Sequence, residues 1–256
     1  MVNDLTLAAD LVQEAGSLAG GMLKEGLTTH YKSSVSDVVS AADHAAEELV
    51  VGRLAEQRPE DGLIGEEGHA KPGERTWYID PVDGTYNFLS GIPYWCSAVG
   101  LVDAAGPVLG AVYYPAMDEL WLGGRDHPTT CNGVEVPRLV DLPMSQISVS
   151  THLQPAKIKD EQRRGRLLAA LRPAATMRML GSSSIDLSYV AGGRLGLFLQ
   201  AQCLPWDWYP GAALVRAAGG VAEVVEQGGL RWHVAGNAEA VAEISAILST
   251  PADEAD

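Results

Sequence analysis

The sequence contains little of what defines several large protein classes. It has three cysteines in 256 residues, Cys96, Cys131 and Cys203, and no Cys-x-x-Cys pair. Such spacing favours reduced core or loop residues over a zinc site or a disulfide framework. No run of 18 apolar residues occurs, so we expect no membrane-spanning helix. Because the first residues also lack the basic and apolar regions of a signal peptide, we expect a cytoplasmic protein.

Basic residues are also scarce. The chain has 18 Lys and Arg against 33 Asp and Glu, which gives a formal net charge of −15. This balance argues against nucleic-acid binding, which needs a basic face. It does not exclude an anionic substrate, because bound metal ions would invert the local field. The sequence also lacks a Ser-His-Asp elbow and a phosphate-loop Gly-Lys-Ser/Thr motif.

The most informative segment present is residues 77–88, Trp-Tyr-Ile-Asp-Pro-Val-Asp-Gly-Thr-Tyr-Asn-Phe. A strand-like run ends here in Asp80 and Asp83, and the proline between them forces a turn. Both carboxylates and the intervening carbonyl can then face one point, which suits a hard divalent cation. The Gly84-Thr85 step adds backbone N–H groups and a hydroxyl, which suit an anion such as phosphate. The segment therefore predicts metal-assisted phosphoryl chemistry.

Two further acidic elements accompany this turn. Glu66 and Glu67 follow a short apolar run, and neighbours in an extended segment point to opposite sides. One glutamate can thus ligate a metal while the other reaches a water. Asp207 begins a predicted helix that stops at Gly219-Gly220, where it can cap the helix, bind a metal or do both.

Each acidic element also has a plain structural interpretation. Asp80 and Asp83 can be ordinary turn residues, because Asp and Pro favour turns. The two glutamates can belong to a solvated loop, and Asp207 can be a helix cap only. Their joint occurrence in a fixed order favours the functional interpretation.

Taken together, these patterns resemble the inositol monophosphatase family. One signature of that family, W-x-I-D-P-x-D-G-T-x-N-F, matches residues 77–88, and the other, W-D-x-x-x-G…A-G-G, matches residues 206–220. The resemblance extends from about residue 5 to residue 248. It includes shorter matches at Gly65-Glu66-Glu67, at Lys32, Asp37, Val38, Val39, Ser40 and Asp43, at Asn132-Gly133, and at residues 181–187.

The resemblance implies a fold and an activity. The fold would be a layered α-β-α-β-α sandwich of the inositol monophosphatase and fructose-1,6-bisphosphatase type, formed by one domain over residues 1–256. Its approximate halves would be residues 1–140, which bind metal, and residues 141–250, with a frayed acidic tail at 251–256. The activity would be Mg²⁺-dependent hydrolysis of a phosphate monoester by a homodimer, with two or three Mg²⁺ ions that Mn²⁺ can replace.

The resemblance also assigns roles to individual residues. The implied metal ligands are Glu66, Asp80, the Val82 carbonyl, Asp83 and Asp207. The implied catalytic residues are Glu67, which orients or activates the attacking water, and Thr85 with Asp43 behind it. The implied substrate-binding residues are Asp83, Gly84, Thr85, Gly181, Ser182, Ser183, Gln200 and Asp207.

Departures from the family pattern leave the substrate open. Gln200 stands where inositol phosphatases usually have a glutamate, and Gly196 stands where they frequently have an aspartate. Gln200 can also be an ordinary polar residue at the end of a strand. Trp208 and Tyr209 replace small residues, and they either reshape the pocket mouth or pack between layers. We therefore expect a small phosphorylated metabolite: an inositol, sugar, nucleotide or histidinol phosphate. A non-catalytic regulatory protein is the remote alternative.

Local patterns predict the surrounding elements. Apolar residues at helical spacing predict a first helix from Leu5 to Met22, and Ser40 with Asp43 predicts a capping box for a helix through about Arg58. Strands are expected over residues 77–123, and helices over 160–172 and 183–191. Ser182 and Ser183 meet substrate or simply cap the last of these. The cluster of Arg163, Arg164 and Arg166 could attract phosphate, but a solvated helix face is the preferred interpretation. His69 is the only histidine expected near the site.

Overall fold

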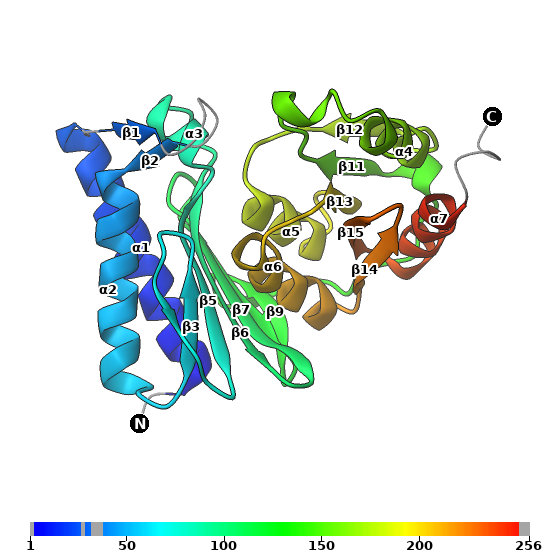
Figure 1. The fold of residues 1–256 in the computed structure, drawn as a ribbon. Coiled ribbons are helices and arrows are strands. Elements are labelled where there is room, and N and C mark those ends of the chain that lie inside the picture. The colour runs from blue at the N-terminus through cyan, green and yellow to red at the C-terminus, as the bar shows by residue number, and fades with distance from the viewer. Residues whose placement is uncertain (1–2, 27–28, 32–37, 251–256) are drawn as a thin grey trace.

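The computed structural model describes residues 3–26, 29–31 and 38–250 of the chain (Figure 1). Lys32, Asp37 and the predicted frayed tail at 251–256 lie outside the described residues, as do the side chains of residues 38–40. The predicted capping box at Ser40 therefore stays a prediction. No helix among the described residues is long and apolar enough to cross a membrane.

Five layers stack side by side across the molecule, as Figure 1 shows. Helices α1 (Asp4–Glu25) and α2 (Ala41–Gln57) cover the outer face of a large sheet. Helices α5 (Ser183–Ala191) and α6 (Pro205–Ala217) lie between this sheet and a smaller one. Helices α4 (Glu161–Leu171) and α7 (Ala238–Ser249) cover the far side of the smaller sheet. This arrangement confirms the predicted α-β-α-β-α sandwich.

The large sheet has the strand order β10-β9-β8-β7-β6-β5-β3-β4, and β3 and β5 form its parallel pair. Its strands are β3 (Gly62–Gly65), β4 (Ala70–Lys71), β5 (Thr76–Asp83), β6 (Cys96–Asp103), β7 (Gly106–Tyr114), β8 (Glu119–Gly124), β9 (His127–Cys131) and β10 (Val134–Glu135). The short helix α3 (Thr85–Leu89) follows β5 directly, and a separate hairpin pairs β1 (Thr29–Tyr31) with β2 (Val38–Ser40).

The smaller sheet has the order β12-β11-β13-β15-β14. Its strands are β11 (Ser148–Thr151), β12 (Thr176–Arg178), β13 (Leu197–Ala201), β14 (Val221–Gln227) and β15 (Leu230–Gly236), and two 3₁₀ turns, η1 (Met144–Gln146) and η2 (Pro155–Lys157), flank β11. The strands of the two sheets fall on opposite sides of residue 140. The division into functional halves stays a prediction.

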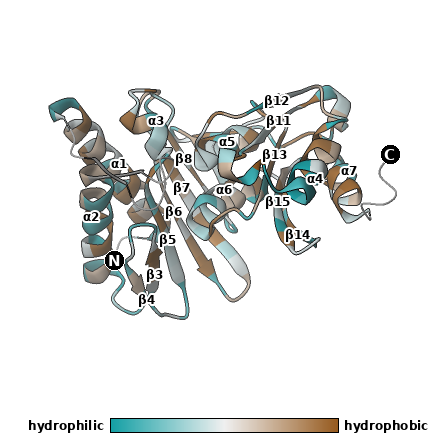
Figure 2. Ribbon diagram, turned by 45° about the horizontal axis from the view of Figure 1, so that its top comes forward, coloured by the Kyte–Doolittle hydropathy of each residue, from teal (hydrophilic) through white to brown (hydrophobic). Residues whose placement is uncertain are grey.

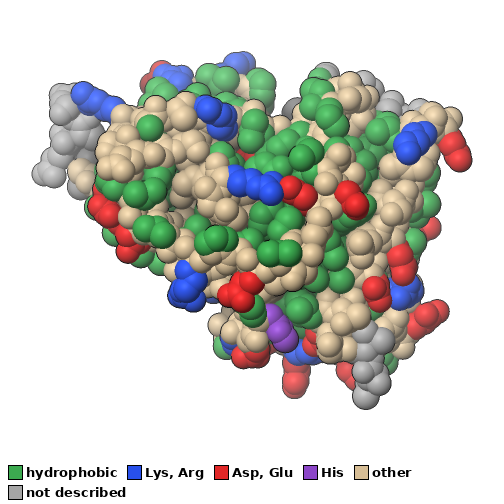
Figure 3. Space-filling view, turned by 180° about the vertical axis from the view of Figure 1, so that it is seen from behind, with side chains coloured by type: hydrophobic (Ala, Val, Ile, Leu, Met, Phe, Trp, Pro, Cys, Tyr) green, Lys and Arg blue, Asp and Glu red, His purple; other side chains and the backbone are tan. Residues whose placement is uncertain are grey.

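Hydrophobic residues occupy the interfaces between these layers. In Figure 2 hydrophobic colour follows the central strands, whereas the connecting turns at their ends are hydrophilic. One apolar cluster lies between α1, α2 and the large sheet, a second surrounds α5 and α6, and a third lies between the smaller sheet and α7. On the face seen in Figure 3, Lys and Arg side chains are scattered rather than gathered in one patch.

Two paired glycines of the large sheet leave room for the backbone of helix α6. Gly100 and Gly110 are partners in β6 and β7, and a Cβ on either would lie within 2.9 Å of a Pro210 backbone atom. Pro210 is the sixth residue of α6 and lies inside the helix, beyond its first turn. The helix starts earlier than expected because Pro205 occupies its first position, which proline favours.

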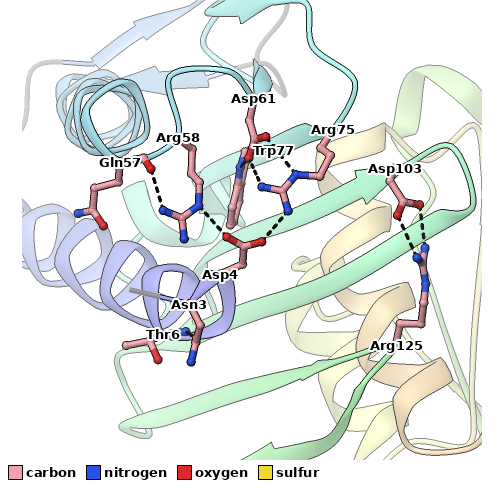
Figure 4. Close-up of polar contacts among 10 residues, drawn as sticks. All are labelled: Asn3, Asp4, Thr6, Gln57, Arg58, Asp61, Arg75, Trp77, Asp103 and Arg125. Atoms are coloured by element: carbon pink, nitrogen blue, oxygen red, sulfur yellow. Dashed lines mark hydrogen bonds and ion pairs between the residues drawn. The ribbon is translucent and has the colours of Figure 1, made fainter. Parts of the chain in front are cut away.

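An ion-pair network fixes the outer helices against the start of β5 (Figure 4). Asp4 on α1 accepts hydrogen bonds from Arg58 and Arg75, both at 2.7 Å. Asp61 accepts from Arg75 at 2.7 Å and from the Trp77 indole nitrogen at 2.9 Å. Burial opposes ionisation of Asp4, yet the two arginines hold its pKa below the usual value. The network therefore anchors one end of β5, whose other end carries the aspartates of the site.

Candidate active site

A cavity of about 360 Å³ opens where the end of β5 meets the N-terminal ends of α5 and α6. The predicted site residues that line it are Glu66, Asp80, Asp83, Gly84, Thr85, Gly181, Ser182, Ser183, Gln200 and Asp207. Three other predicted site residues, Asp43, Glu67 and Val82, do not line it. Residues far apart in the sequence thus meet at one place, although their individual roles stay predictions.

Three aspartates form the centre of the cavity. One carboxylate oxygen each from Asp80, Asp83 and Asp207 lies within 4.8 Å of the other two. The register of β5 against β6 shifts between Asp80 and Asp83, so the bulge lets both carboxylates leave the strand towards the cavity. Among the described residues, Asp80 Oδ1 is a buried oxygen without a hydrogen-bond partner. Such an arrangement is costly unless a cation or proton compensates it.

The electrostatics of the cluster reflect this crowding. Burial raises the pKa of Asp80 well above its ordinary value, and the charges of Glu66, Asp83 and Asp207 raise it further. Burial, followed by the charge of Asp83, raises the pKa of Asp207 to about 7. Burial also raises the pKa of Asp83, but hydrogen bonds from Ser184 and Ser182 oppose the shift. A divalent cation would remove the repulsion that all three groups share.

Helix α5 holds Asp83 in place from across the cavity. The Ser182 hydroxyl donates to Asp83 Oδ2 at 3.0 Å, and the Ser184 N–H donates to the same oxygen at 2.5 Å. Ser182 is also the N-cap, because its side chain accepts from the Ile185 N–H at 3.3 Å. The capping interpretation of Ser182 is therefore confirmed, and the same residue also lines the cavity. The Ser183 hydroxyl donates to Gln200 Oε1 at 3.3 Å and orients that amide.

Asp207 reaches the cluster from the first turn of α6. Leu204 is the N-cap and Pro205 the first residue of this helix, so the expectation that Asp207 begins it is wrong by two residues. The Asp207 carboxylate accepts a hydrogen bond from the backbone N–H of Leu204. This contact is one of the two hydrogen bonds of a capping box. In it, the side chain of the third helical residue accepts from the backbone N–H of the N-cap residue. Asp207 thus combines a capping contact with a place beside Asp80.

A sharp turn after Asp83 places Gly84 and Thr85 against the cavity. Gly84 has φ +97°, and a Cβ there would lie 3.0 Å from the Tyr94 carbonyl and 3.1 Å from the Gly181 carbonyl. The position therefore needs glycine. The Thr85 hydroxyl lies 3.1 Å from the Val82 carbonyl and 3.3 Å from Asp43 Oδ1. Asp43 thus lies behind Thr85, as the resemblance implies.

Glu66 and Glu67 diverge after β3. Glu66 lines the cavity, whereas the Glu67 side chain is 2% exposed and lies 3.5 Å from His44 Nδ1. The expectation that His69 is the only histidine near the site is therefore wrong. The buried Glu47 carboxylate accepts from the Glu67 N–H at 2.8 Å and contacts His69 Nδ1 at 2.7 Å, so it shapes this turn.

Two sequence departures have clear structural outcomes. Gln200 lies within β13, pairs with His233 of β15 and lines the cavity. Trp208 is buried in the core beside Phe198, and Tyr209 packs against Tyr78 with ring centroids 4.7 Å apart and the ring planes tilted by 39°. Neither aromatic residue lines the acidic cavity, which confirms packing between layers over a reshaped pocket mouth.

Sequence reasoning missed several residues that line the cavity. Asp186 is the most important of these, because its carboxylate accepts from the Tyr94 hydroxyl at 2.7 Å and burial raises its pKa to about 7. A signal was available, since Asp186 lies three residues after Ser183 in the predicted helix and so on one face of it. The other missed lining residues, for which no local motif exists, are Tyr86, His152, Gln154, Gln202 and Leu204.

The donor set fits a hard divalent cation. All the charged groups of the cluster are carboxylates, the ligands that Mg²⁺ and Ca²⁺ prefer, and no cysteine or histidine among the described residues joins them. The unpartnered Asp80 Oδ1 supplies an oxygen that the protein itself does not satisfy. The residues present are therefore suited to hold a metal ion.

Comparison with known proteins agrees with this geometry. A model of the inositol monophosphatase family matches residues 2–250. Inositol monophosphatase 3 of Solanum lycopersicum is 34% identical over 223 residues, which cover 82% of this chain and 83% of that protein. Inositol-1-monophosphatase of Rhizobium meliloti (strain 1021) is 36% identical over 205 residues, covering 76% and 74%. The crystal structure of extragenic suppressor protein suhB from Bartonella henselae superposes with a TM-score of 0.85 at 26% identity, covering 96% and 98%.

Proposed function

The chain belongs to the inositol monophosphatase family, and from this premise we propose that it hydrolyses a small phosphate monoester with the help of Mg²⁺ held by the acidic cluster. Membership of the family makes it a phosphoric monoester hydrolase. The observation that carries the metal assignment is the convergence of Asp80, Asp83 and Asp207 around a buried, unpartnered carboxylate oxygen. Burying such carboxylates together is costly unless a cation or a proton compensates their charge, and a divalent cation compensates several of them at once.

The metal would be held by Asp80, Asp83 and Asp207, with Glu66 and the Val82 carbonyl as further ligands. We propose two or three Mg²⁺ ions, which Mn²⁺ can replace. When bound, these ions neutralise the phosphate dianion and lower the pKa of a bound water.

The remaining roles belong to side chains and amides of the protein. The Thr85 hydroxyl, which lies 3.3 Å from Asp43 Oδ1, would help to polarise the attacking water, and Glu67 is proposed to orient that water. The backbone amides of Gly84 and Thr85 border the same cavity and are suited to receive the phosphate. Phosphoryl transfer needs mainly such positioning and charge stabilisation.

Substrate hydroxyls are proposed to contact the opposite wall, formed by Gly181, Ser182, Ser183 and Gln200. Because Gln200 brings an amide rather than a carboxylate, inositol monophosphate is one candidate among several. Histidinol phosphate, sugar phosphates and nucleotides are the alternatives. The regulatory alternative stays open to test, because the name suhB describes an extragenic suppressor rather than a reaction.

Two properties of the intact protein are proposed from the sequence. The homodimeric assembly rests on the family resemblance, and the cytoplasmic location rests on the three cysteines, whose spacing favours reduced residues. Sedimentation equilibrium and cell fractionation would test them separately from the chemistry.

The decisive experiment is phosphate release from a panel of metabolites, with and without Mg²⁺. The panel holds inositol 1-phosphate, histidinol phosphate, fructose 1,6-bisphosphate and phosphoadenosine phosphate. We expect phosphate release that requires Mg²⁺. We also expect this release to be lost in D83N, which lacks the Asp83 carboxylate. The matched control is D103N, because Asp103 forms an exposed ion pair with Arg125 far from the cavity. Full activity after exhaustive chelation, or unchanged activity in D83N, would contradict the proposal.

A further inference from the structure

A second cavity, of about 320 Å³, adjoins the acidic one and differs from it in charge. Five residues line both cavities: His152, Gln154, Gln200, Gln202 and Leu204. The charged residues of the second cavity are Lys157 and Arg163, and no aspartate or glutamate lines it. The acidic cavity has the opposite lining, with five carboxylates and no lysine or arginine.

Arg163 is the central observation. It lies on α4 and is only 8% exposed, so the expectation of a solvated helix face is wrong for this residue. Among the described residues its guanidinium has no hydrogen-bond or ion-pair partner, and Nε is fully buried. Burial of a permanently charged, unpartnered arginine is costly, and the cavity is the place from which a partner can come.

The neighbours of Arg163 fit the same kind of ligand. Trp232 lines the cavity, and its buried indole Nε1 also lacks a partner among the described residues. The shared residues between the two cavities carry amides and an imidazole but no carboxylate. An anion can therefore extend from the acidic cavity to Arg163 without passing a negative charge.

From this geometry we infer that the substrate carries a second anionic group, a phosphate or a carboxylate, which Arg163 and Lys157 bind in the second cavity while the scissile phosphate occupies the first. A planar guanidinium binds two oxygens of such a group at once, and this pairing is among the strongest hydrogen-bonded contacts in proteins. The inference rests on the proposed function and narrows its substrate class.

The kinetic test compares substrates that differ only in a second anionic group. Two pairs are used: glucose 1-phosphate with glucose 1,6-bisphosphate, and glycerol 3-phosphate with 3-phosphoglycerate. We expect the wild type to favour the doubly anionic member of at least one pair by about tenfold in kcat/KM, and R163M to abolish the preference. R164M is the matched control, because Arg164 lies next on α4 and donates to the Ile158 carbonyl instead.

A binding test keeps this inference separate from the proposed function. When a chelator has removed the metal ions, the carboxylates of the acidic cavity repel phosphate. The second cavity keeps its positive charge, because Lys157 and Arg163 are side chains of the protein. Calorimetric titration of the metal-free protein with inorganic phosphate should show binding to wild type and R164M and none to R163M. If R163M does not fold, R163K should show weakened binding, because it keeps the charge but loses the planar fork. Two results would overturn the inference and show that water alone solvates Arg163. One is equal phosphate binding by wild type and R163M, and the other is the same preference of both proteins for doubly over singly anionic substrates.

Discussion

Two adjoining cavities of this protein share five lining residues yet carry opposite charge. The first gathers carboxylates from β5, α5 and α6, and the second gathers Lys157 and Arg163 from η2 and α4. A carboxylate cluster binds an anion only through cations that it has already bound, whereas an arginine binds an anion directly. The formal charge of −15 therefore says little about either cavity, because local placement decides what each one binds.

The largest expected effect concerns the acidic cavity. Asp80→Asn should lower phosphate monoester hydrolysis by about 100-fold or more, since metal ions supply several kcal/mol of charge stabilisation. The melting temperature of the metal-free variant should not fall, because burial and the charges of Glu66, Asp83 and Asp207 disfavour the ionised Asp80 carboxylate, whereas an amide at this position carries no charge. Activity assays and calorimetric melting measure the two properties. Loss of activity together with a strongly lowered melting temperature would indicate a structural role instead.

The second prediction concerns pH and stability. Burial raises the pKa values of Asp207 and Asp186 to about 7 from an ordinary 3.8. Between these values the folded protein binds more protons than the unfolded chain, so metal-free stability should fall as pH rises from about 4 to about 7. We expect a melting temperature several degrees lower at pH 8 than at pH 5, and added Mg²⁺ should restore it at pH 8.

The control for this pH dependence is D207N. Burial lowers the pKa of His233 to about 4, which makes stability rise with pH up to about 6.5 and opposes the aspartates. This opposing contribution is the same in both proteins, so the difference between wild type and D207N reports Asp207 together with its charge interaction with Asp80. The same change in melting temperature from pH 5 to pH 8 in both proteins would refute the assignment.

A smaller effect is expected where the two cavities meet. Gln200→Glu places a carboxylate beside both, and it should lower kcat/KM for a doubly anionic substrate by about fivefold, with a weaker effect on its singly anionic counterpart. Q13E provides the control, because Gln13 is exposed on α1 in the outer layer. Equal effects on both substrates would mean that position 200 acts only on the scissile phosphate.

The smallest expected effect tests the orientation of the Gln200 amide without a change in charge. Ser183→Ala removes the 3.3 Å hydrogen bond to Gln200 Oε1 without altering any charge. A neutral hydrogen bond of this kind contributes about 1 kcal/mol, so KM should rise by about two- to fivefold with kcat unchanged. Steady-state kinetics of a monophosphate substrate measure both constants. A lowered kcat would show that Ser183 acts on the reacting phosphate rather than on Gln200.

Sequence reasoning succeeded where the controlling interactions are local. The apolar spacing from Leu5 to Met22 located α1, and the range 183–191 matches α5 residue for residue. The Asp-Pro-Val-Asp-Gly-Thr segment identified the end of β5, because proline and glycine restrict the backbone over a few residues. The fold class followed from the family motifs and is confirmed.

The sequence by itself thus located α1, α4 and α5 and the turn that carries the acidic residues, because each of these depends on neighbours within a few residues. Only the tertiary structure decided that Asp207 lies beside Asp80, that Glu47 shapes the turn after β3, and that Arg163 is buried rather than solvated. These outcomes depend on how α4 and α6 pack against the sheets, and packing between distant segments leaves no short-range pattern in the chain.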